Sequence, residues 1–241
     1  MIVLFTDFGG HGPYLGQMEV VIRQILPSEP VVNLVADAPR FDPKASAYLL
    51  AALAANIPRQ SVVLAVVDPG VGGERRPLVV EADGVTFVGP DNGLFEPLVR
   101  RARTVRTWEI VWRPDILSPS FHGRDLFAPI AARLAAGLCP EDVGCRLVDV
   151  PRRPDWPDDL AAIIYHDHYG NAWTGIRASV LGADVILRAG GRAFHRARTF
   201  SDVPPGDAFW YENSSGLAEF AVNGGVAAEI AALAIGSDVT K

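Results

Sequence analysis

The first half of the chain alternates between continuously apolar runs and longer segments whose apolar residues recur at helical spacing. The apolar runs lie at 2–8, 31–36 and 61–67. The helical segments lie at 14–26, 44–56 and 127–138. Continuous apolar runs are typical of strands that are buried on both faces of a sheet. Their alternation with helices predicts an α/β fold with a parallel sheet flanked by helices.

The pattern changes near residue 150, where three prolines fall close together and indicate a linker. They are Pro151, Pro154 and Pro157. Beyond them the apolar runs become shorter and more alternating, with glycine-bearing turns between them. These runs lie at 160–166, 184–189, 208–212 and 218–223. They predict a small β domain closed by a short helix at 226–235, so we expect an α/β domain over 1–150 and a β domain over 158–241.

Composition and charge narrow the class of protein. The 241 residues are 49% hydrophobic and 21% charged, as in ordinary globular proteins. The formal net charge of −6 argues against a nucleic-acid-binding protein, which usually carries a basic face. No stretch reaches the ~18 consecutive apolar residues of a membrane span. The first ten residues lack the basic region of a signal peptide and are typical of a first strand.

The two cysteines and the histidines predict neither a disulfide framework nor a metal site. Cys139 and Cys145 have no CxxC spacing, and although a disulfide between them is open, we favour two reduced thiols in a cytoplasmic protein. His166 and His168 share one face of a strand, but no third ligand is evident in the sequence.

Two carboxylates follow predicted strands at the point where each strand ends. Asp7 follows the first strand in "TDFGG", and Asp68 follows another in "VVDPGVG". A single aspartate at this place is most often a turn or a helix cap. In open α/β sheets, however, ligands bind beyond the carboxyl ends of the strands, so a site that includes both aspartates is the alternative.

A third polar cluster, "FHGRD", precedes the helical segment at 127–138. Its Asp125 would cap that helix in the structural interpretation, with His122 as a surface residue. In the functional interpretation His122 titrates near neutral pH and positions or accepts a proton, with Gly123 leaving room beside the ring.

Other polar segments keep two interpretations open. We favour a plain turn for Asp91 and Asn92 in "PDNG", although both could line a pocket. The segments 167–175 and 212–225 are each either a hairpin turn or the polar edge of a nucleoside site. The pattern alone thus ends at a two-domain α/β enzyme or ligand-binding protein with a polar site at the strand ends.

The order of the motifs resembles one known family. "TDFGG…PYLGQM", "VVDPGVGGERR", "GPDNGLF", "FHGRDLFAP", "DHYGN" and "NSSG…AVNGG" resemble the S-adenosyl-L-methionine (SAM) hydroxide adenosyltransferases, or SAM hydrolases, of the fluorinase/chlorinase superfamily. The resemblance runs over residues 2–236. It implies a Rossmann-like N-terminal domain and a C-terminal β-barrel.

The resemblance also implies a reaction and a catalytic set. Water or hydroxide attacks C5′ of the ribose of SAM and expels L-methionine, leaving adenosine. No cofactor is implied, because SAM is the substrate. The family's aspartate, arginine and histidine fall on Asp68, Arg75 and His122, with Arg76 as the neighbour most easily confused with Arg75.

Substrate-binding roles follow from the same resemblance. Asp7 would bind the ribose hydroxyls, and Phe41 and Phe121 would contact the nucleoside. Asp167 would meet the methionine ammonium, and Tyr169 and Asn171 the adenine. Ser214 and Ser215 would hold the methionine carboxylate. The family also implies a homotrimer whose sites combine the N-domain of one subunit with a neighbouring C-domain.

Two alternative functions are weighed against hydrolysis. A SAM-dependent halogenase is disfavoured, because halogenating relatives have a tyrosine where Asp68 stands and fluorinases a serine where Gly123 stands. A carboxylate beside the nucleophile would also repel a halide. A non-catalytic SAM or adenosine binder would have no use for the set Asp68, Arg75 and His122.

Overall fold

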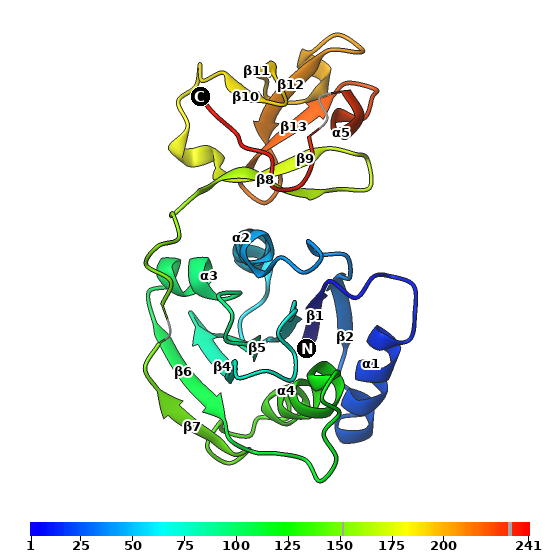
Figure 1. Cartoon of the computed structure of the whole chain (residues 1–241), viewed down its shortest axis with the longest axis vertical. Helices are drawn as coiled ribbons and strands as arrows, with labels where there is room; N and C mark the ends of the chain where they lie inside the picture. The colour runs from blue at the N-terminus through cyan, green and yellow to red at the C-terminus, as the bar shows by residue number, and fades with distance from the viewer. Residues whose placement is uncertain (151, 231–232) are drawn as a thin grey trace. The chain divides into compact units, whose positions relative to one another are not determined.

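The computed structural model describes residues 1–150, 152–230 and 233–241. Two compact units make up the chain, one of Met1–Leu50 with Ile57–Arg153 and the other of Ala51–Asn56 with Pro154–Lys241 (Figure 1). Pro151 of the predicted linker and part of the predicted helix at 226–235 lie outside the described residues.

The first unit is built on a seven-stranded sheet in the order β2-β1-β3-β5-β4-β6-β7. Its strands are β1 Ile2–Thr6, β2 Val31–Val35, β3 Val62–Val66, β4 Pro77–Ala82, β5 Val85–Pro90, β6 Val105–Ile110 and β7 Cys145–Val148. Its helices are α1 Tyr14–Ile25, α2 Pro43–Leu53, which ends three residues into the second unit, α3 Glu96–Arg101 and α4 Ala128–Ala135. The predicted strands and helices of the first half are therefore confirmed, with the helix at 44–56 ending in a 3-10 turn over Ala54–Asn56.

The sheet is mixed, so the prediction of a parallel sheet is correct only in part. β2, β1, β3 and β5 run parallel, but β4 pairs antiparallel with β5 and with β6, and β7 pairs antiparallel with β6. The physical reason lies in the two-residue connection Asp83-Gly84, where both residues have positive φ (48° and 87°). Such a turn joins antiparallel strands, whereas parallel strands need a long crossover.

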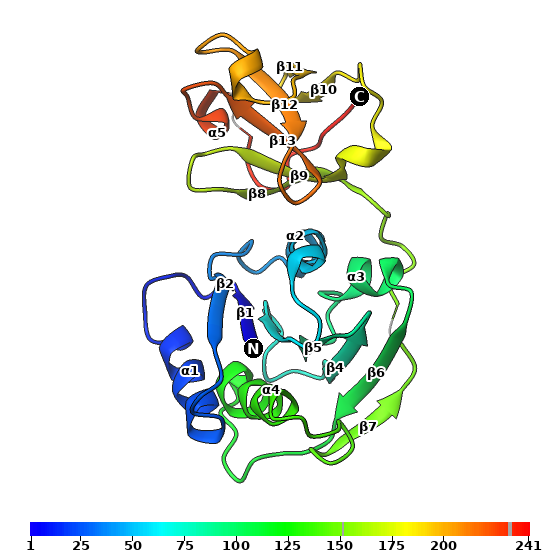
Figure 2. The same ribbon diagram turned by 180° about the vertical axis from the view of Figure 1, so that it is seen from behind.

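Side chains of alternate strand residues face helices on the two sides of this sheet. Leu4, Leu64 and Val66 belong to one buried cluster with Met18 of α1 and Ile130 of α4. α1 and α4 lie next to each other on this side, and the part of α2 that belongs to this unit lies on the opposite side (Figures 1 and 2). The central strands β1 and β3 are thus covered on both faces, as their continuous apolar sequences require. The expectation of a buried strand is wrong for β2, because it lies at the edge of the sheet and leaves Val32 and Leu34 exposed.

The second unit contains a six-stranded sheet in the order β10-β11-β12-β13-β9-β8. Its elements are β8 Leu160–His166, β9 Ala172–Arg177, β10 Leu187–Ala189, β11 Arg192–Arg196, β12 Ala208–Glu212, β13 Leu217–Val222 and α5 Ala227–Ile230. The prediction of a small β unit with a short terminal helix is confirmed for the described residues, where the helix covers only Ala227–Ile230.

The C-terminal segment reaches both outer strands of this second sheet. Ile163 of β8 donates to Ser237 O (2.9 Å), and Val239 N–H donates to Ala161 O (2.9 Å). On the other side, Arg188 of β10 and Thr240 exchange backbone hydrogen bonds of 2.8 and 2.9 Å. Because one segment satisfies polar groups at both edges, neither edge is left fully open.

Two further findings concern the helices and the cysteines. Among the described residues, no helix combines the length and the apolar character needed to cross a membrane. Cys139 and Cys145 are both free thiols, and burial raises the pKa of Cys145 to about 11.

The closure by the C-terminal segment is expected to stabilise the second unit. Val239 is buried in its core with Phe194 and Phe220, whose rings lie 4.3 Å apart. Val239→Asp would place a charge among apolar side chains and should lower the free energy of unfolding by about 2–4 kcal/mol, measured by denaturant titration. Thr240→Asp adds the same side chain at the adjacent exposed position and is the matched control; equal stability of the two variants would contradict the role of the segment.

Candidate active site

The ends of β1 and β3 bring two aspartates to one cavity. The two strands are parallel neighbours with Thr6 opposite Val66, so the residues that follow them emerge at the same edge. Asp7 and Asp68 both line a cavity of about 540 Å³, here called the strand-end cavity. Its other lining residues are Phe8, Tyr14, Phe41, Val66, Pro69, Val71, Ser120, Phe121, His122 and Gly123.

Arg75 lies between Asp68 and His122 and contacts both. Its Nε is 3.1 and 3.0 Å from the two carboxylate oxygens of Asp68, and its Nη2 also donates to Oδ2. The same Nη2 lies 2.9 Å from Nδ1 of His122. The side chains of Arg75 and Asp68 are only 10% and 4% exposed. The structure thus brings together the three residues that the resemblance assigns to catalysis.

The contact with Arg75 fixes the protonation of His122. A guanidinium only donates, so Nδ1 of the ring must accept, and the neutral ring carries its proton on Nε2. Burial, and then the positive charge of Arg75, lower the pKa of His122 below its ordinary value of 6.5, against the opposing effect of Asp68. His122 is therefore a neutral hydrogen-bond donor at neutral pH.

The neighbouring Arg76 points to a different partner. Its Nε and Nη2 lie 2.9 and 2.7 Å from Oδ2 of Asp91, so it does not share the Asp68 carboxylate.

The loop between β3 and β4 also needs glycine at Gly72, which has φ of +78°. A Cβ at that position would lie 2.5 Å from the carbonyl oxygen of Pro119.

Aromatic side chains form one wall of the strand-end cavity. The ring centroids of Phe8 and Phe121 lie 5.8 Å apart, and those of Tyr14 and Phe121 lie 5.3 Å apart, both edge to face. Phe41 is 77% exposed, and its backbone N–H donates to Asp7 (3.0 Å). Burial raises the pKa of Asp7. The sequence interpretation missed Phe8 and Tyr14, although both stand inside its quoted motifs.

The polar cluster before α4 is not a helix cap. A π-helical turn over Gly123–Phe127 precedes α4. Asp125 accepts from Ser118 N–H (2.9 Å) and pairs with Arg124, whose hydrogen bond lowers the pKa of Asp125. The alternative that Asp125 caps the helix is therefore wrong, because its carboxylate instead fastens the preceding loop.

The second unit holds a cavity of its own, of about 640 Å³, here called the β-unit cavity. Its lining residues are Asp167, Tyr169, Asn171, Trp173, Phe200, Tyr211, Asn213, Ser214, Glu219, Val222, Gly224 and Gly225. Four of the residues expected to bind substrate therefore line it. Ser215 is not among the lining residues, and its backbone N–H donates to Oδ1 of Asn213 (2.9 Å).

A buried network of polar side chains organises the β-unit cavity. Asp167 accepts from the backbone and the side-chain amide of Asn171 (2.9 and 3.0 Å). The two oxygens of Glu219 accept from Tyr211 Oη (2.6 Å) and Asn213 Nδ2 (2.8 Å). Burial raises the pKa of Glu219. The sequence interpretation missed Glu219, whose only signal is an acidic residue inside the apolar strand β13.

No group of three or more metal-ligating side chains occurs within the described ranges, so no residue set there is assigned to a metal.

The position of Arg75 generates a prediction about His122. In an NMR titration, His122 of the unaltered protein should titrate below pH 6.5. Arg75→Met removes a charge that lowers the pKa and leaves Asp68, so the pKa of His122 should rise. Asp68→Asn should move it in the opposite direction.

The lowered pKa of His122 also determines how the stability of the protein depends on pH. Because the folded state favours neutral His122, its contribution to stability is present above pH 6.5 and is lost as the pH falls through the lowered pKa. An unchanged pKa of His122 in both variants would contradict the assigned geometry.

Comparisons with known proteins identify the family of this chain. Residues 2–144 match the N-terminal domain of the SAM hydroxide adenosyltransferases, and residues 161–240 match their C-terminal domain. A protein of Thermus thermophilus named (R)-S-adenosyl-L-methionine hydrolase is 36% identical, over 99% of this chain and 98% of its own length. A crystal structure of an uncharacterized conserved protein from Thermotoga maritima is 30% identical and superposes with a TM-score of 0.88, covering 100% of both chains. A fluorinase of Nocardia brasiliensis is 24% identical over 75% of this chain and 72% of its own length. The chain therefore belongs to the SAM hydroxide adenosyltransferase family.

Proposed function

We propose that this protein hydrolyses S-adenosyl-L-methionine to adenosine and L-methionine. The observation that carries the proposal is the cluster of Asp68, Arg75 and His122 at a cavity with an aromatic wall. A binding protein has no need of a carboxylate and an imidazole joined by one guanidinium. The names of the relatives, hydrolases over the full length of the chain, support the same reaction.

The reaction requires a better nucleophile more than a better leaving group. Methionine leaves a sulfonium as a neutral thioether, so no general acid is needed at the sulfur. Water attacks C5′ of the ribose, the C5′–S bond breaks with its electron pair going to sulfur, and one water proton is released. Within this cluster Asp68 is the proposed proton acceptor, since Nδ1 of His122 is already engaged by Arg75. The Nε2–H of His122 then donates to the water oxygen and orients it.

The same carboxylate disfavours halide as the nucleophile. Asp68 lines the strand-end cavity, and a chloride or fluoride beside it would experience repulsion in a partly desolvated place. The fluorinase relative is also less similar than the hydrolases.

Each cavity is proposed to hold a different part of the substrate. In the strand-end cavity, Asp7 would accept from the ribose hydroxyls, and Phe41 and Phe121 would contact the nucleoside. In the β-unit cavity, Asp167 would meet the ammonium, and Ser214, with Ser215 nearby, the carboxylate. Asn171, whose Nδ2 donates to Asp167 (3.0 Å), would contact the adenine beside Tyr169.

The configuration of the substrate's sulfur is part of the proposal. In the name of the relatives, L already specifies the α-carbon, so the prefix (R) specifies the other variable centre, the sulfonium. We take the (R) sulfonium form as the preferred substrate.

The finer description of the fold and the assembly also belongs to this proposal. A Rossmann-like domain over 1–150 and a closed β-barrel over 158–241 are supported by the parallel half-sheet and by the C-terminal segment that joins β8 and β10. A homotrimer would let the strand-end cavity of one subunit meet the β-unit cavity of a neighbour.

The first test is direct incubation with the two sulfonium diastereomers, separately, with and without high chloride. We expect adenosine and methionine from the (R) form, with no chlorinated nucleoside, identified by chromatography and mass. Asp68→Asn should lower kcat by ~10²-fold or more while binding of substrate persists. A 5′-chloro-nucleoside, or binding without turnover, would refute the proposed reaction.

A second test addresses the assembly by complementation between two inactive variants. Asp68→Ala disables the strand-end cavity and Asp167→Ala the β-unit cavity. If sites combine two subunits, re-assembled 1:1 mixtures should recover up to about a quarter of the unaltered activity, because that share of sites unites two intact halves. A mixture as inactive as its components would mean that each chain uses only its own two cavities, or that the chain does not assemble.

A further inference from the structure

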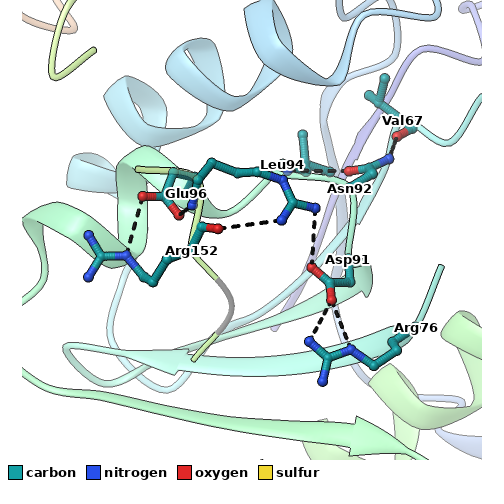
Figure 3. A network of polar contacts seen from close by, with 8 residues as sticks. Val67, Arg76, Asp91, Asn92, Leu94, Glu96 and Arg152 are labelled. Atoms are coloured by element: carbon teal, nitrogen blue, oxygen red, sulfur yellow. Dashed lines mark hydrogen bonds and ion pairs between the residues drawn. The ribbon is translucent and has the colours of Figure 1, made fainter. Parts of the chain in front are cut away.

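Two consecutive residues after β5, Asp91 and Asn92, contact both ends of the loop between β3 and β4 (Figure 3). Nδ2 of Asn92 donates to the backbone carbonyl of Val67 (2.8 Å), at the start of the loop. At its end, the N–H of Asp91 donates to Arg76 O (2.8 Å). The Asp91 carboxylate also accepts from Nε and Nη2 of Arg76. The loop that carries the catalytic carboxylate and guanidinium is therefore held at both ends from one place.

A plain turn does not account for these contacts. The turn itself needs only the hydrogen bond from Leu94 N–H to Oδ1 of Asn92 (3.3 Å). The Val67 carbonyl and the Arg76 guanidinium lie 25 and 15 residues away along the chain. Neither Asp91 nor Asn92 lines the strand-end cavity or the β-unit cavity, so they have no direct role with substrate there.

The segment that makes these contacts is itself held by a buried carboxylate. Glu96, whose side chain is 2% exposed, accepts from Arg100 (2.8 Å) and from the backbone N–H of Arg153 (2.8 Å). The Arg153 guanidinium in turn lies 3.8 Å from Asp91. Figure 3 shows the Asn92 contacts with Val67 and Leu94, the Asp91 contacts with Arg76, and the contact of Glu96 with Arg152. A buried charge with several donors is costly to displace, so the segment provides a firm base.

Because two arginines are adjacent in this loop, anchoring one of them determines which one can contact the catalytic residues. Arg75 and Arg76 are adjacent and chemically identical, and only one of them reaches Asp68 and His122. Fixing Arg76 on Asp91 leaves Arg75 as the guanidinium that contacts Asp68 and His122. Fixing the Val67 carbonyl fixes the backbone position of Asp68, the next residue.

We infer that Asp91 and Asn92 are positioning residues for catalysis, acting through Arg76 and Val67 to hold Arg75 against Asp68 and His122. The inference rests on the proposed function for its kinetic consequence. Its structural consequence, the contact of Arg75 with His122, does not depend on which reaction the protein performs.

The test uses two nearly isosteric variants, Asn92→Asp and Asp91→Asn. In Asn92→Asp, a carboxylate oxygen replaces the donor to the Val67 carbonyl and repels it, while Oδ1 can still accept from Leu94. In Asp91→Asn, the charge that holds Arg76 is lost. A displacement of about 1 Å in a catalytic group can cost ~10²-fold in rate, so kcat for SAM hydrolysis should fall by ~10- to 100-fold with KM nearly unchanged. The pKa of His122, followed by NMR, should rise as Arg75 withdraws.

The matched control is Asp83→Asn at the opposite end of the same β4–β5 hairpin. Asp83 accepts from the backbone of Arg103 and Thr104, and asparagine tolerates its positive φ of 48°. This variant should change neither kcat nor the pKa of His122. Thermal unfolding of all three variants separates positioning from stability.

Each outcome decides the inference. A folded Asn92→Asp or Asp91→Asn variant whose kcat and His122 pKa match those of Asp83→Asn would overturn it, even if its melting temperature fell. If the unaltered protein shows no turnover, the proposed function fails, and the His122 titration alone decides the positioning role. Should one variant fail to unfold cooperatively, the other is decisive.

Discussion

The guanidinium of Arg75 donates hydrogen bonds to two buried groups, the carboxylate of Asp68 and the imidazole of His122. The organisation of the first unit depends on the need of these two groups for a partner. A carboxylate that is only 4% exposed is costly to ionise without a partner, and Arg75 supplies charge and hydrogen bonds to Asp68. Nη2 of the same guanidinium, which also donates to Asp68, engages His122 with its second hydrogen. One side chain therefore keeps the carboxylate and the imidazole close together and determines which nitrogen of the imidazole bears the proton.

The topology of the sheet explains how residues that follow β5 can fix the position of Arg75 in the loop between β3 and β4. β5 lies between β3 and β4, so the chain that leaves β3 must cross the end of β5 before it enters β4. The residues that follow β5 are located at this crossing, and the pairing of Pro77 with Pro90 brings Arg76 beside Asp91. The antiparallel hairpin that departs from a simple parallel sheet is thus the feature that lets the 91–92 segment hold the catalytic loop.

The sequence predicted the elements whose signal is local and missed those whose signal lies in tertiary contacts. Continuous apolar runs are sufficient to predict β1 and β3, which are buried along their whole length, and they also located β2, although most of this edge strand is exposed. The Asp83-Gly84 turn carried a hairpin signal that the alternation of strands and helices obscured. The choice of Arg75 over Arg76 came from the family resemblance, because two adjacent arginines look alike until their partners are known. Glu219 was missed because its partners Tyr211 and Asn213 become neighbours of β13 only through sheet pairing.

The electrostatics of the two cavities favour the same kind of ligand. Burial raises the pKa of Asp7 in the first unit and of Glu219 in the second, which means that ionising each carboxyl there is unfavourable in the free protein. A ligand that brings hydroxyl donors and positive charge reverses this, because it stabilises the ionised carboxylates that the protein has desolvated. S-adenosyl-L-methionine offers both, with ribose hydroxyls, a sulfonium and an ammonium. When hydrolysis removes the sulfonium charge, one of these attractions is lost, so the products should be held less strongly than the substrate and release should follow from the chemistry itself.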